Sequence, residues 1–293
     1  APASCPMADN RSSTGDVALG EMSTIFRCKS RSFSATALEL AKDGAHVFVA
    51  CRSRPKGEEA ASDIRERANN ANVEFFELDL ASLASVRSGA ARFLERGLPL
   101  HLLINNAGVA GQRGETAEGF ELHFGTNHLG HFLLTDLLLD RIKASAPARI
   151  VNVSSTMHYK AKALDLHAVR GSTKSITGLP EYEVSKLANV LFSAELARRL
   201  EGSRVTTYSL HPGGVASDAY RRIPWPFRKL VTMGMLTNEE GAKTSLHCAL
   251  SDEAGKETGL YYDKSRVREP SALAQNEVLA KELWDRSAAW TRA

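Results

Sequence analysis

The chain has 293 residues, of which 43% are hydrophobic and 24% are charged, and its formal net charge is +3. That length and apolar content suit one large domain with a sizeable core. Lysine and arginine are spread along the chain instead of forming a basic stripe, which argues against nucleic acid as a partner. No run of about 18 apolar residues occurs, so the sequence predicts no membrane-spanning helix.

Residues 1–21 are rich in Ser, Gly, Ala and Pro and have weak periodicity. They predict a disordered leader ahead of a domain over residues 22–293. The four cysteines show no CxxC or other metal-ligand spacing, so we expect no metal site. This cysteine usage suits a reducing compartment, and no charged-then-apolar signal pattern is seen, so we expect a cytoplasmic protein.

Helical and strand patterns alternate from residue 36 onward without a break in composition. The first helical run extends from Thr36 to Lys42, and Gly44 is placed to cap its C-terminus. Short apolar segments predict strands over 46–51, 73–78, 100–104, 148–153 and 204–210. Helical patterns cover 57–68, 82–95, 118–143, 181–201 and 272–290.

This alternation predicts an α/β fold, a doubly wound parallel sheet of the Rossmann-like kind, in a single domain. Helices then cover both faces of the sheet, and the carboxyl ends of the strands form the edge where ligands bind. The segment over 215–238 interrupts the alternation, because it is apolar and broken by prolines (IPWPFRKLVTMGML).

The stretch before the first helix departs from the expected pattern. In a nucleotide-binding βαβ unit, a glycine-rich turn lets a pyrophosphate approach the helix N-terminus. Residues 23–27 (STIFR) have the character of a first strand, but residues 26–33 (FRCKSRSF) contain no glycine. Basic side chains there attract phosphate by charge, yet they do not replace a turn that needs unusual backbone angles and close approach.

Four short motifs follow predicted strands or begin the next helix. They are NNAG at 105–108, the pair Ser154-Ser155, YEVSK at 182–186 and HPGG at 211–214. Each by itself has an ordinary structural interpretation, as a turn or as an exposed Tyr–Lys helix pair.

The pair Tyr182 and Lys186 has the clearest chemical meaning. A spacing of four residues puts the phenol and the ammonium on one helix face. A nearby ammonium favours the phenolate and lowers a tyrosine pKa from about 10 towards neutral pH. Tyr182 is therefore a candidate general acid and base for a carbonyl and alcohol pair.

In this order, and after these strands, the motifs resemble those of the short-chain dehydrogenase/reductase family, and of its retinol-dehydrogenase-like branch in particular. The resemblance covers about residues 36–290 and is carried by DL at 79–80, NNAG, TNHLGHF at 126–132, RIVNVSS at 149–155, YEVSKLAN and LHPGG. It implies a nicotinamide-dependent oxidoreductase.

The resemblance also implies roles for the catalytic residues. Tyr182 would exchange a proton with the substrate oxygen, and Lys186 would hold the nicotinamide ribose and lower the Tyr182 pKa. Ser155, rather than Ser154, would hydrogen-bond the substrate carbonyl. Asn127 would hold a water in a relay to Lys186.

The cofactor-binding residues are implied in the same way. Asp79 and Leu80 would lie at the adenine, and Pro212 and Gly213 would border the nicotinamide. The adenosine side would be contacted by Asn106, Ala107 and Gly108.

Arg52 indicates which cofactor is used. An arginine at the end of the second strand accommodates the 2′-phosphate of NADP, whereas an acid there binds the ribose 2′-OH of NAD. Here that strand runs into CRSR, with Arg54 close by. We therefore expect NADP(H), with an ordinary surface arginine as the alternative.

The family's TGxxxGxG pattern should fall on residues 26–33, and none of its Thr or Gly positions is matched. Three interpretations follow: an NADP-dependent enzyme, a cofactor-impaired relative that acts as a non-catalytic binding protein, and an enzyme whose N-terminal sequence is mis-joined. The presence of all four catalytic residues favours an enzyme over a non-catalytic relative. Family-like sequence begins abruptly near residue 35, which favours a mis-joined N-terminal sequence as the reason why the glycine pattern is missing.

The apolar residues of 223–237 resemble the segment that covers the substrate in this family. They suit a retinoid-, steroid- or lipid-like carbonyl or alcohol. A homodimer contact or a peripheral contact with a membrane surface is the alternative, because relatives in the retinol branch are often found at the endoplasmic reticulum membrane.

Overall fold

The computed structural model describes residues 23–27, 31–213 and 238–292. The predicted leader and almost all of the predicted apolar segment over 215–238 lie outside these ranges. Within them, the strands form one sheet in the order β3-β2-β1-β4-β5-β6-β7-β8. All neighbouring strands pair in parallel except β7 and β8, which are antiparallel.

The strands are β1 (Ser23–Arg27), β2 (His46–Cys51), β3 (Val73–Glu77), β4 (Leu102–Asn105), β5 (Ala148–Val153), β6 (Val205–His211), β7 (Tyr261–Asp263) and β8 (Arg266–Val267). The longer helices are α1 (Arg31–Lys42), α2 (Arg54–Ala68), α3 (Leu83–Glu95), α5 (Gly130–Ala144), α6 (Leu179–Arg199), α8 (Asn238–Leu250) and α10 (Glu277–Arg292). The short helices are α4 (Leu122–Phe124), η2 (Gly125–Leu129), η3 (Thr156–Lys160), α9 (Asp252–Gly255) and η5 (Ala272–Gln275).

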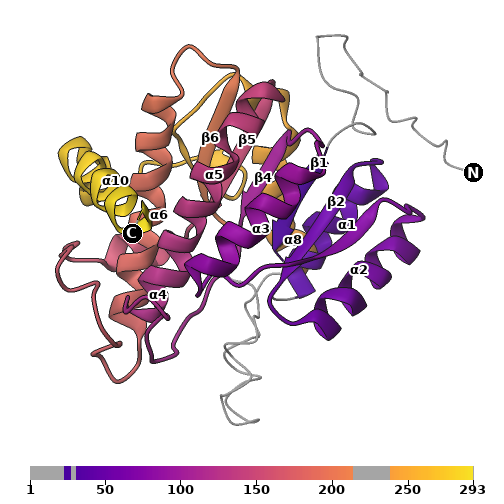
Figure 1. The fold of residues 1–293 in the computed structure, drawn as a ribbon. Coiled ribbons are helices and arrows are strands. Elements are labelled where there is room, and N and C mark those ends of the chain that lie inside the picture. The colour runs from indigo at the N-terminus through magenta and orange to yellow at the C-terminus, as the bar shows by residue number, and fades with distance from the viewer. Residues whose placement is uncertain (1–22, 28–30, 214–237, 293) are drawn as a thin grey trace, which may run out of the picture.

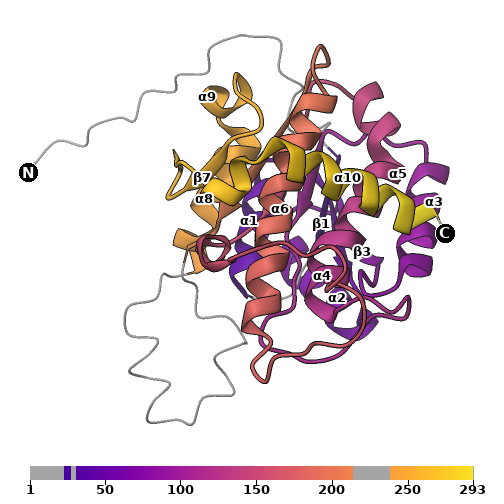
Figure 2. The ribbon, with the colours of Figure 1, turned by 90° about the vertical axis from the view of Figure 1, so that its left-hand side faces the viewer.

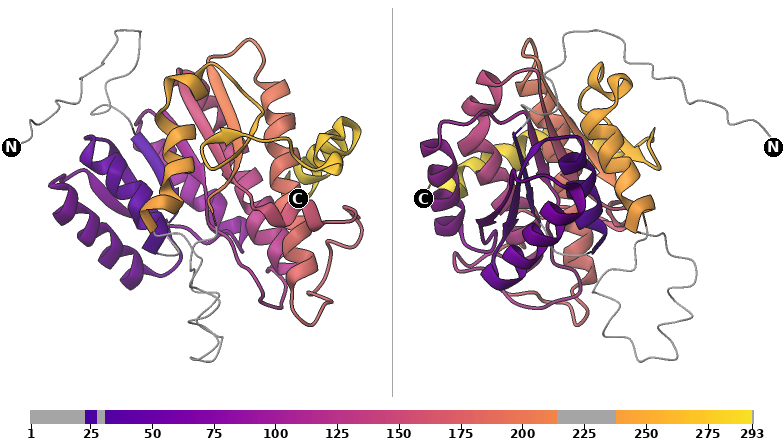
Figure 3. Two further views of the ribbon diagram at one scale, coloured as in Figure 1. Left: turned by 180° about the vertical axis from the view of Figure 1, so that it is seen from behind. Right: turned by 90° about the vertical axis from the view of Figure 1, so that its right-hand side faces the viewer.

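The sheet is the middle layer of three (Figure 1). Side chains of a strand alternate between its two faces, and the two core clusters follow that alternation. Phe48 packs with α3, α5 and α6 on one face, whereas its neighbours Val47 and Val49 pack with α1, α2 and α8 on the other. Figure 3 shows this second layer from behind. The predicted Rossmann-like α/β fold is confirmed.

The N-terminal unit is complete as secondary structure despite its unusual sequence. β1 lies at the centre of the sheet between β2 and β4. Helix α1 begins at Arg31, five residues before the predicted run, and ends before Gly44. The φ of Gly44 is 88°, a left-handed conformation that glycine adopts readily. Only residues 28–30 separate this strand from this helix.

Two predicted helices are divided in the structure, and two short strands were not predicted. The helix predicted over 118–143 is divided, because the π-helical turn η2 shifts the hydrogen bonding between α4 and α5. The helix predicted over 272–290 is divided into η5 and α10. The strands β7 and β8 were not predicted, since three and two residues are too few for a period of two to be visible.

Helix α10 crosses the outer side of α6 near α5 (Figure 2). Its Leu283 belongs to the core cluster, and Trp284 stacks on Phe192 of α6 at 5.8 Å between ring centres. Among the described residues, no helix is long and apolar enough to cross a membrane.

Candidate active site

Lys186 and Tyr182 lie on the first turns of α6, beside the carboxyl end of β5. The Lys186 ammonium donates to the carbonyl oxygen of Val153 at 2.9 Å and lies 5.6 Å from the centre of the Tyr182 ring. Lys186 is buried, and Tyr182 is half-buried. The helical spacing therefore does place the two side chains together, as the sequence predicts.

The two serines after β5 have different surroundings. Ser154 donates its hydroxyl hydrogen to the Lys186 carbonyl oxygen at 2.7 Å, which ties β5 to α6. Ser155 is the N-cap of η3, and its Oγ accepts the backbone N–H of Met157 at 3.2 Å. Because Oγ acts as an acceptor there, the Ser155 hydroxyl hydrogen is left to donate elsewhere.

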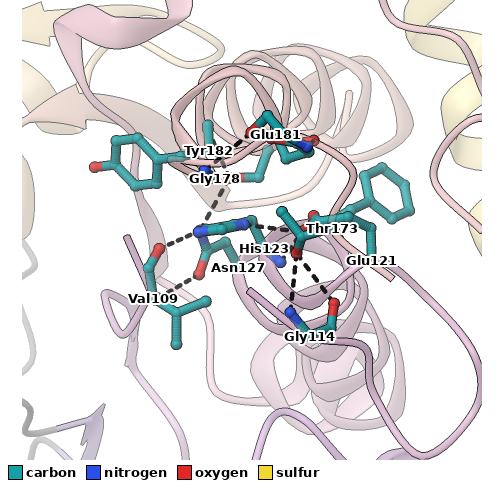
Figure 4. A network of polar contacts seen from close by, with 12 residues as sticks. Val109, Gly114, Glu121, His123, Asn127, Thr173, Gly178, Glu181 and Tyr182 are labelled. Atoms are coloured by element: carbon teal, nitrogen blue, oxygen red, sulfur yellow. Dashed lines mark hydrogen bonds and ion pairs between the residues drawn. The ribbon is translucent and has the colours of Figure 1, made fainter. Parts of the chain in front are cut away.

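Asn127, in the π-helical turn η2, connects three parts of the site. Its amide donates to the Val109 carbonyl oxygen at 3.0 Å and to the Ser185 hydroxyl at 2.9 Å, and its Oδ1 accepts the Val109 N–H at 2.7 Å. Figure 4 shows the two bonds to Val109. A Cβ on Gly108 would lie 2.9 Å from Oδ1 of Asn127 and 3.6 Å from Nζ of Lys186. Asn127 and Lys186 therefore border the same small space, which a glycine keeps open.

A buried pair, Glu121 and His123, lies on the side of Tyr182 facing α4. Nδ1 of His123 lies 2.8 Å from Oε1 of Glu121, and the ring centres of His123 and Tyr182 are 6.2 Å apart. Figure 4 shows His123 between Glu121 and the turn of α6 that begins at Gly178. A Cβ on Gly178 would lie 2.8 Å from Cε1 of His123, so a glycine is needed there for close approach.

Sequence reasoning missed His123. Its spacing of four residues from Asn127 was a usable signal, because positions four apart share a helix face.

The residues proposed for the adenosine end follow β2, β3 and β4. Arg52 is exposed directly after β2, and Arg54 is paired with Glu58 and Glu77 at 3.2 and 2.8 Å. Asp79 is half-buried, and its Oδ1 accepts the backbone N–H of Ala81 at 3.1 Å.

Three further residues of that group, Leu80, Asn106 and Ala107, are buried, and Leu80 and Ala107 belong to the core. The apolar side chains of Leu80 and Ala107 pack inside the protein. The main chain of these two residues is therefore the part that is left to contact a cofactor.

The residues predicted to border the nicotinamide lie where β6 ends. Pro212 and Gly213 follow His211 and are half-buried, and Gly213 has a φ of 90°. Such a backbone conformation is open to glycine and lets the chain turn sharply at the sheet edge. Because β5 and β6 are parallel and paired up to Val153 and Leu210, this turn lies at the same edge as Ser155.

These observations test how well the residues fit a dinucleotide. At the nicotinamide end they fit, because the Ser155 hydroxyl and the Gly213 turn follow the neighbouring strands β5 and β6, and the buried Lys186 ammonium of α6 reaches the end of β5. At the phosphates they fit poorly, because residues 28–30 between β1 and α1 are Cys, Lys and Ser, without the glycine that close approach needs. In the described part of the chain, no group of three or more His, Cys, Asp or Glu side chains is arranged to hold a metal ion.

The chain matches the family model described as short chain dehydrogenase over residues 34–224. The match starts close to residue 35, where family-like sequence was expected to begin. The chain is also 47% identical to human retinol dehydrogenase 11 over 254 residues, which is 85% of this chain and 79% of that protein. Human retinol dehydrogenase 13 is 42% identical over 262 residues, which is 86% of this chain and 79% of that protein.

Solved structures give the same fold. A crystal structure of an uncharacterised protein from Mycobacterium paratuberculosis has a TM-score of 0.72 and 31% identity, and the match covers 93% of this chain and 94% of that chain. Actinorhodin polyketide ketoreductase with NADPH has a TM-score of 0.65 at 22% identity, with coverages of 83% and 95%. A 3-ketoacyl-(acyl-carrier-protein) reductase from Brucella melitensis, complexed with NADH, has a TM-score of 0.64 at 21% identity. That match covers 83% of this chain and 96% of the other chain.

Proposed function

The chain belongs to the short-chain dehydrogenases, and we propose that it transfers a hydride between NADP(H) and an alcohol or carbonyl of an apolar, retinoid-, steroid- or lipid-like substrate. The observation that carries this proposal is the contact between Lys186 and Tyr182 at the carboxyl end of β5, the strand that Ser155 follows. The relatives named as retinol dehydrogenases support the choice of an apolar substrate.

In the proposed reaction, the bound nicotinamide supplies or accepts the hydride. Tyr182 gives its phenolic proton to the substrate oxygen during carbonyl reduction and takes it back during alcohol oxidation. Lys186 stabilises the phenolate by its charge and also contacts the nicotinamide ribose. The Ser155 hydroxyl, whose Oγ already accepts the Met157 N–H, donates its hydrogen to the same substrate oxygen.

Proton supply to Tyr182 is assigned to Lys186 and to a water held at Asn127. The shared space beside Gly108 supports this assignment, because Oδ1 of Asn127 and Nζ of Lys186 both border it. Both hydrogens of the Asn127 amide are engaged by Val109 and Ser185. The side chain is thereby fixed, and its oxygen is the atom that faces this space.

The same proposal assigns the cofactor-binding residues. Pro212 and Gly213 border the nicotinamide, and Asp79 with the main chain of Leu80 contacts the adenine. Asn106, Ala107 and Gly108 contact the adenosine side. Arg52 binds the 2′-phosphate, which makes NADP(H) the preferred cofactor.

The test is carbonyl reduction with NADPH and an apolar aldehyde such as retinaldehyde, in the chain that carries a TGxxxGIG-type turn in place of residues 26–33 and in the same chain with Tyr182→Phe. Loss of a positioned acid typically costs about 10²- to 10⁴-fold in rate. We expect Tyr182→Phe to lose at least that much while its far-ultraviolet circular dichroism stays unchanged. A Tyr182→Phe protein that keeps most of its reduction rate would show that another group transfers the proton.

A further inference from the structure

His158 is a fully buried histidine directly behind Ser155, and both of its ring nitrogens have backbone partners. Nδ1 lies 2.7 Å from the Ser155 carbonyl oxygen, and Nε2 lies 3.2 Å from the backbone nitrogen of Ser271. Ser271 belongs to the segment 268–271 that connects β8 with η5. One imidazole ring therefore joins the serine after β5 to a segment more than a hundred positions later in the chain.

These contacts determine which nitrogen carries the proton. A backbone N–H only donates, so Nε2 must accept from Ser271 and is unprotonated. The ring hydrogen is then on Nδ1, which donates it to the Ser155 carbonyl oxygen. Burial lowers the pKa of His158 below its ordinary value, and the Arg268 guanidinium acts in the same direction against the opposing hydrogen bond to Ser155. A neutral ring with the proton on Nδ1 is the form that fits both neighbours.

Both His158 and Tyr159 of η3 make further contacts, with β7 and with segment 268–271. The His158 ring packs against Tyr261 of β7 at 4.7 Å between ring centres. Tyr159 donates its hydroxyl hydrogen to the Glu269 carbonyl oxygen at 2.5 Å, and Arg268 lies 5.0 Å from the Tyr159 ring centre. Tyr159 contacts the segment 268–271, but among the described residues its side chain makes no hydrogen bond to Ser155, which makes it a matched control for His158.

We propose that His158 is a positioning residue for Ser155: it holds the carbonyl group of that residue against segment 268–271 and so fixes where the Ser155 hydroxyl meets the substrate oxygen. This inference rests on the proposed role of Ser155 in the reaction. The Oγ of Ser155 accepts the Met157 N–H, and its carbonyl oxygen accepts both the backbone N–H and the ring N–H of His158. A shift of its backbone would move the hydroxyl directly.

One arm of the test needs no turnover. In the full unaltered chain, ¹⁵N chemical shifts of the His158 ring should report hydrogen on Nδ1 at neutral pH. Amide exchange of Met157, whose N–H donates to Ser155 Oγ, should become faster in His158→Leu and stay slow in Tyr159→Phe. His158→Gln, whose amide can both donate and accept, should keep the Met157 protection. Hydrogen on Nε2, or unchanged Met157 exchange in His158→Leu, would overturn the proposal even if the protein reduced no carbonyl.

The second arm is a double-mutant cycle with Ser155→Ala, measured in the chain that carries a TGxxxGIG-type turn in place of residues 26–33. His158→Leu alone should lower kcat roughly tenfold to hundredfold, because a misplaced positioning group of this kind costs rates of that order. In the Ser155→Ala background the same change should have almost no further effect, and His158→Gln should recover most of the rate. Independent, multiplying effects of the two substitutions would show that His158 acts on the fold in general and not through Ser155.

Discussion

Arg52 is the side chain on which the proposed preference for NADPH over NADH rests. It is exposed after β2, whereas its neighbour Arg54 is engaged by Glu58 and Glu77. A charge-assisted contact to a 2′-phosphate contributes about 1.5–3 kcal/mol, which is roughly tenfold to a hundredfold in affinity. We therefore expect NADPH to bind more tightly than NADH by that factor, and Arg52→Asp to reverse the order in fluorescence titrations.

Arg54→Ala is the matched control for this experiment. Because Arg54 already has two carboxylate partners, its removal should leave the order of the two cofactors unchanged. Equal binding of NADPH and NADH by the unaltered chain would mean that Arg52 is an ordinary surface residue.

At the scale of single residues, the sequence predicted the contacts of side chains whose partners lie close by in the chain. Tyr182 and Lys186 are four residues apart on one helix, so their contact follows from helical geometry. One of the two partners of His158 is Ser271, and nothing in the local pattern indicates that contact. Residues that act through distant backbone groups are therefore missed until the fold brings the two segments together.

The connection between β1 and α1 is the element that departs from the family. Both elements form, so the helix N-terminus still presents its amides and its dipole to an anion. The three intervening residues, however, carry a Cβ where a pyrophosphate must approach the backbone. We expect weak NADPH binding by this chain, and we expect a TGxxxGIG-type turn in place of residues 26–33 to restore tight binding and turnover together.

Two outcomes would contradict this prediction. Low-micromolar NADPH binding by the unaltered chain would show that the glycine turn is dispensable here. A grafted chain that folds but neither binds NADPH nor reduces carbonyls would place the defect elsewhere and favour the non-catalytic binding protein. Replacing the same residues with an alanine-rich turn of equal length controls for the loss of the basic side chains.

Elements with a full period were predictable, and short or interrupted ones were not. β2 and β5 have the predicted bounds, because a short, mostly apolar run between turns leaves little ambiguity. The π-helical turn that holds Asn127 leaves no such signal, since the hydrophobic pattern of 118–143 continues through it. The break lies at the candidate site, where such turns are frequent.

At the scale of the whole molecule, His128 links the candidate site to the C-terminal helix. It follows Asn127 in the chain, and its Nε2 lies 2.9 Å from the Ser287 hydroxyl of α10. Burial lowers the pKa of His128 from 6.5 to about 3. Between about pH 6.5 and pH 3, His128 is therefore protonated in the unfolded chain and neutral in the folded protein.

The free energy of unfolding should consequently be fully retained above pH 6.5 and should decrease as the pH falls from 6.5 towards 3. The His128 contribution to that slope is at most about 1.4 kcal/mol per pH unit. Urea unfolding of His128→Gln between these pH values should show a shallower decrease. His167→Gln, which changes an exposed histidine, should keep the original slope, and equal slopes in all three proteins would contradict the prediction.

The claim that this chain carries the complete chemistry of a carbonyl reductase is tested most directly by following the hydride. The full chain with the grafted glycine turn is incubated with NADPH deuterated at the transferring position and with an apolar aldehyde, and the alcohol is analysed by mass spectrometry. We predict one deuterium on the carbon of the former carbonyl, and no labelled alcohol from the same chain carrying Tyr182→Phe. Tight NADPH binding without any labelled alcohol, or equal labelling by both proteins, would contradict the account.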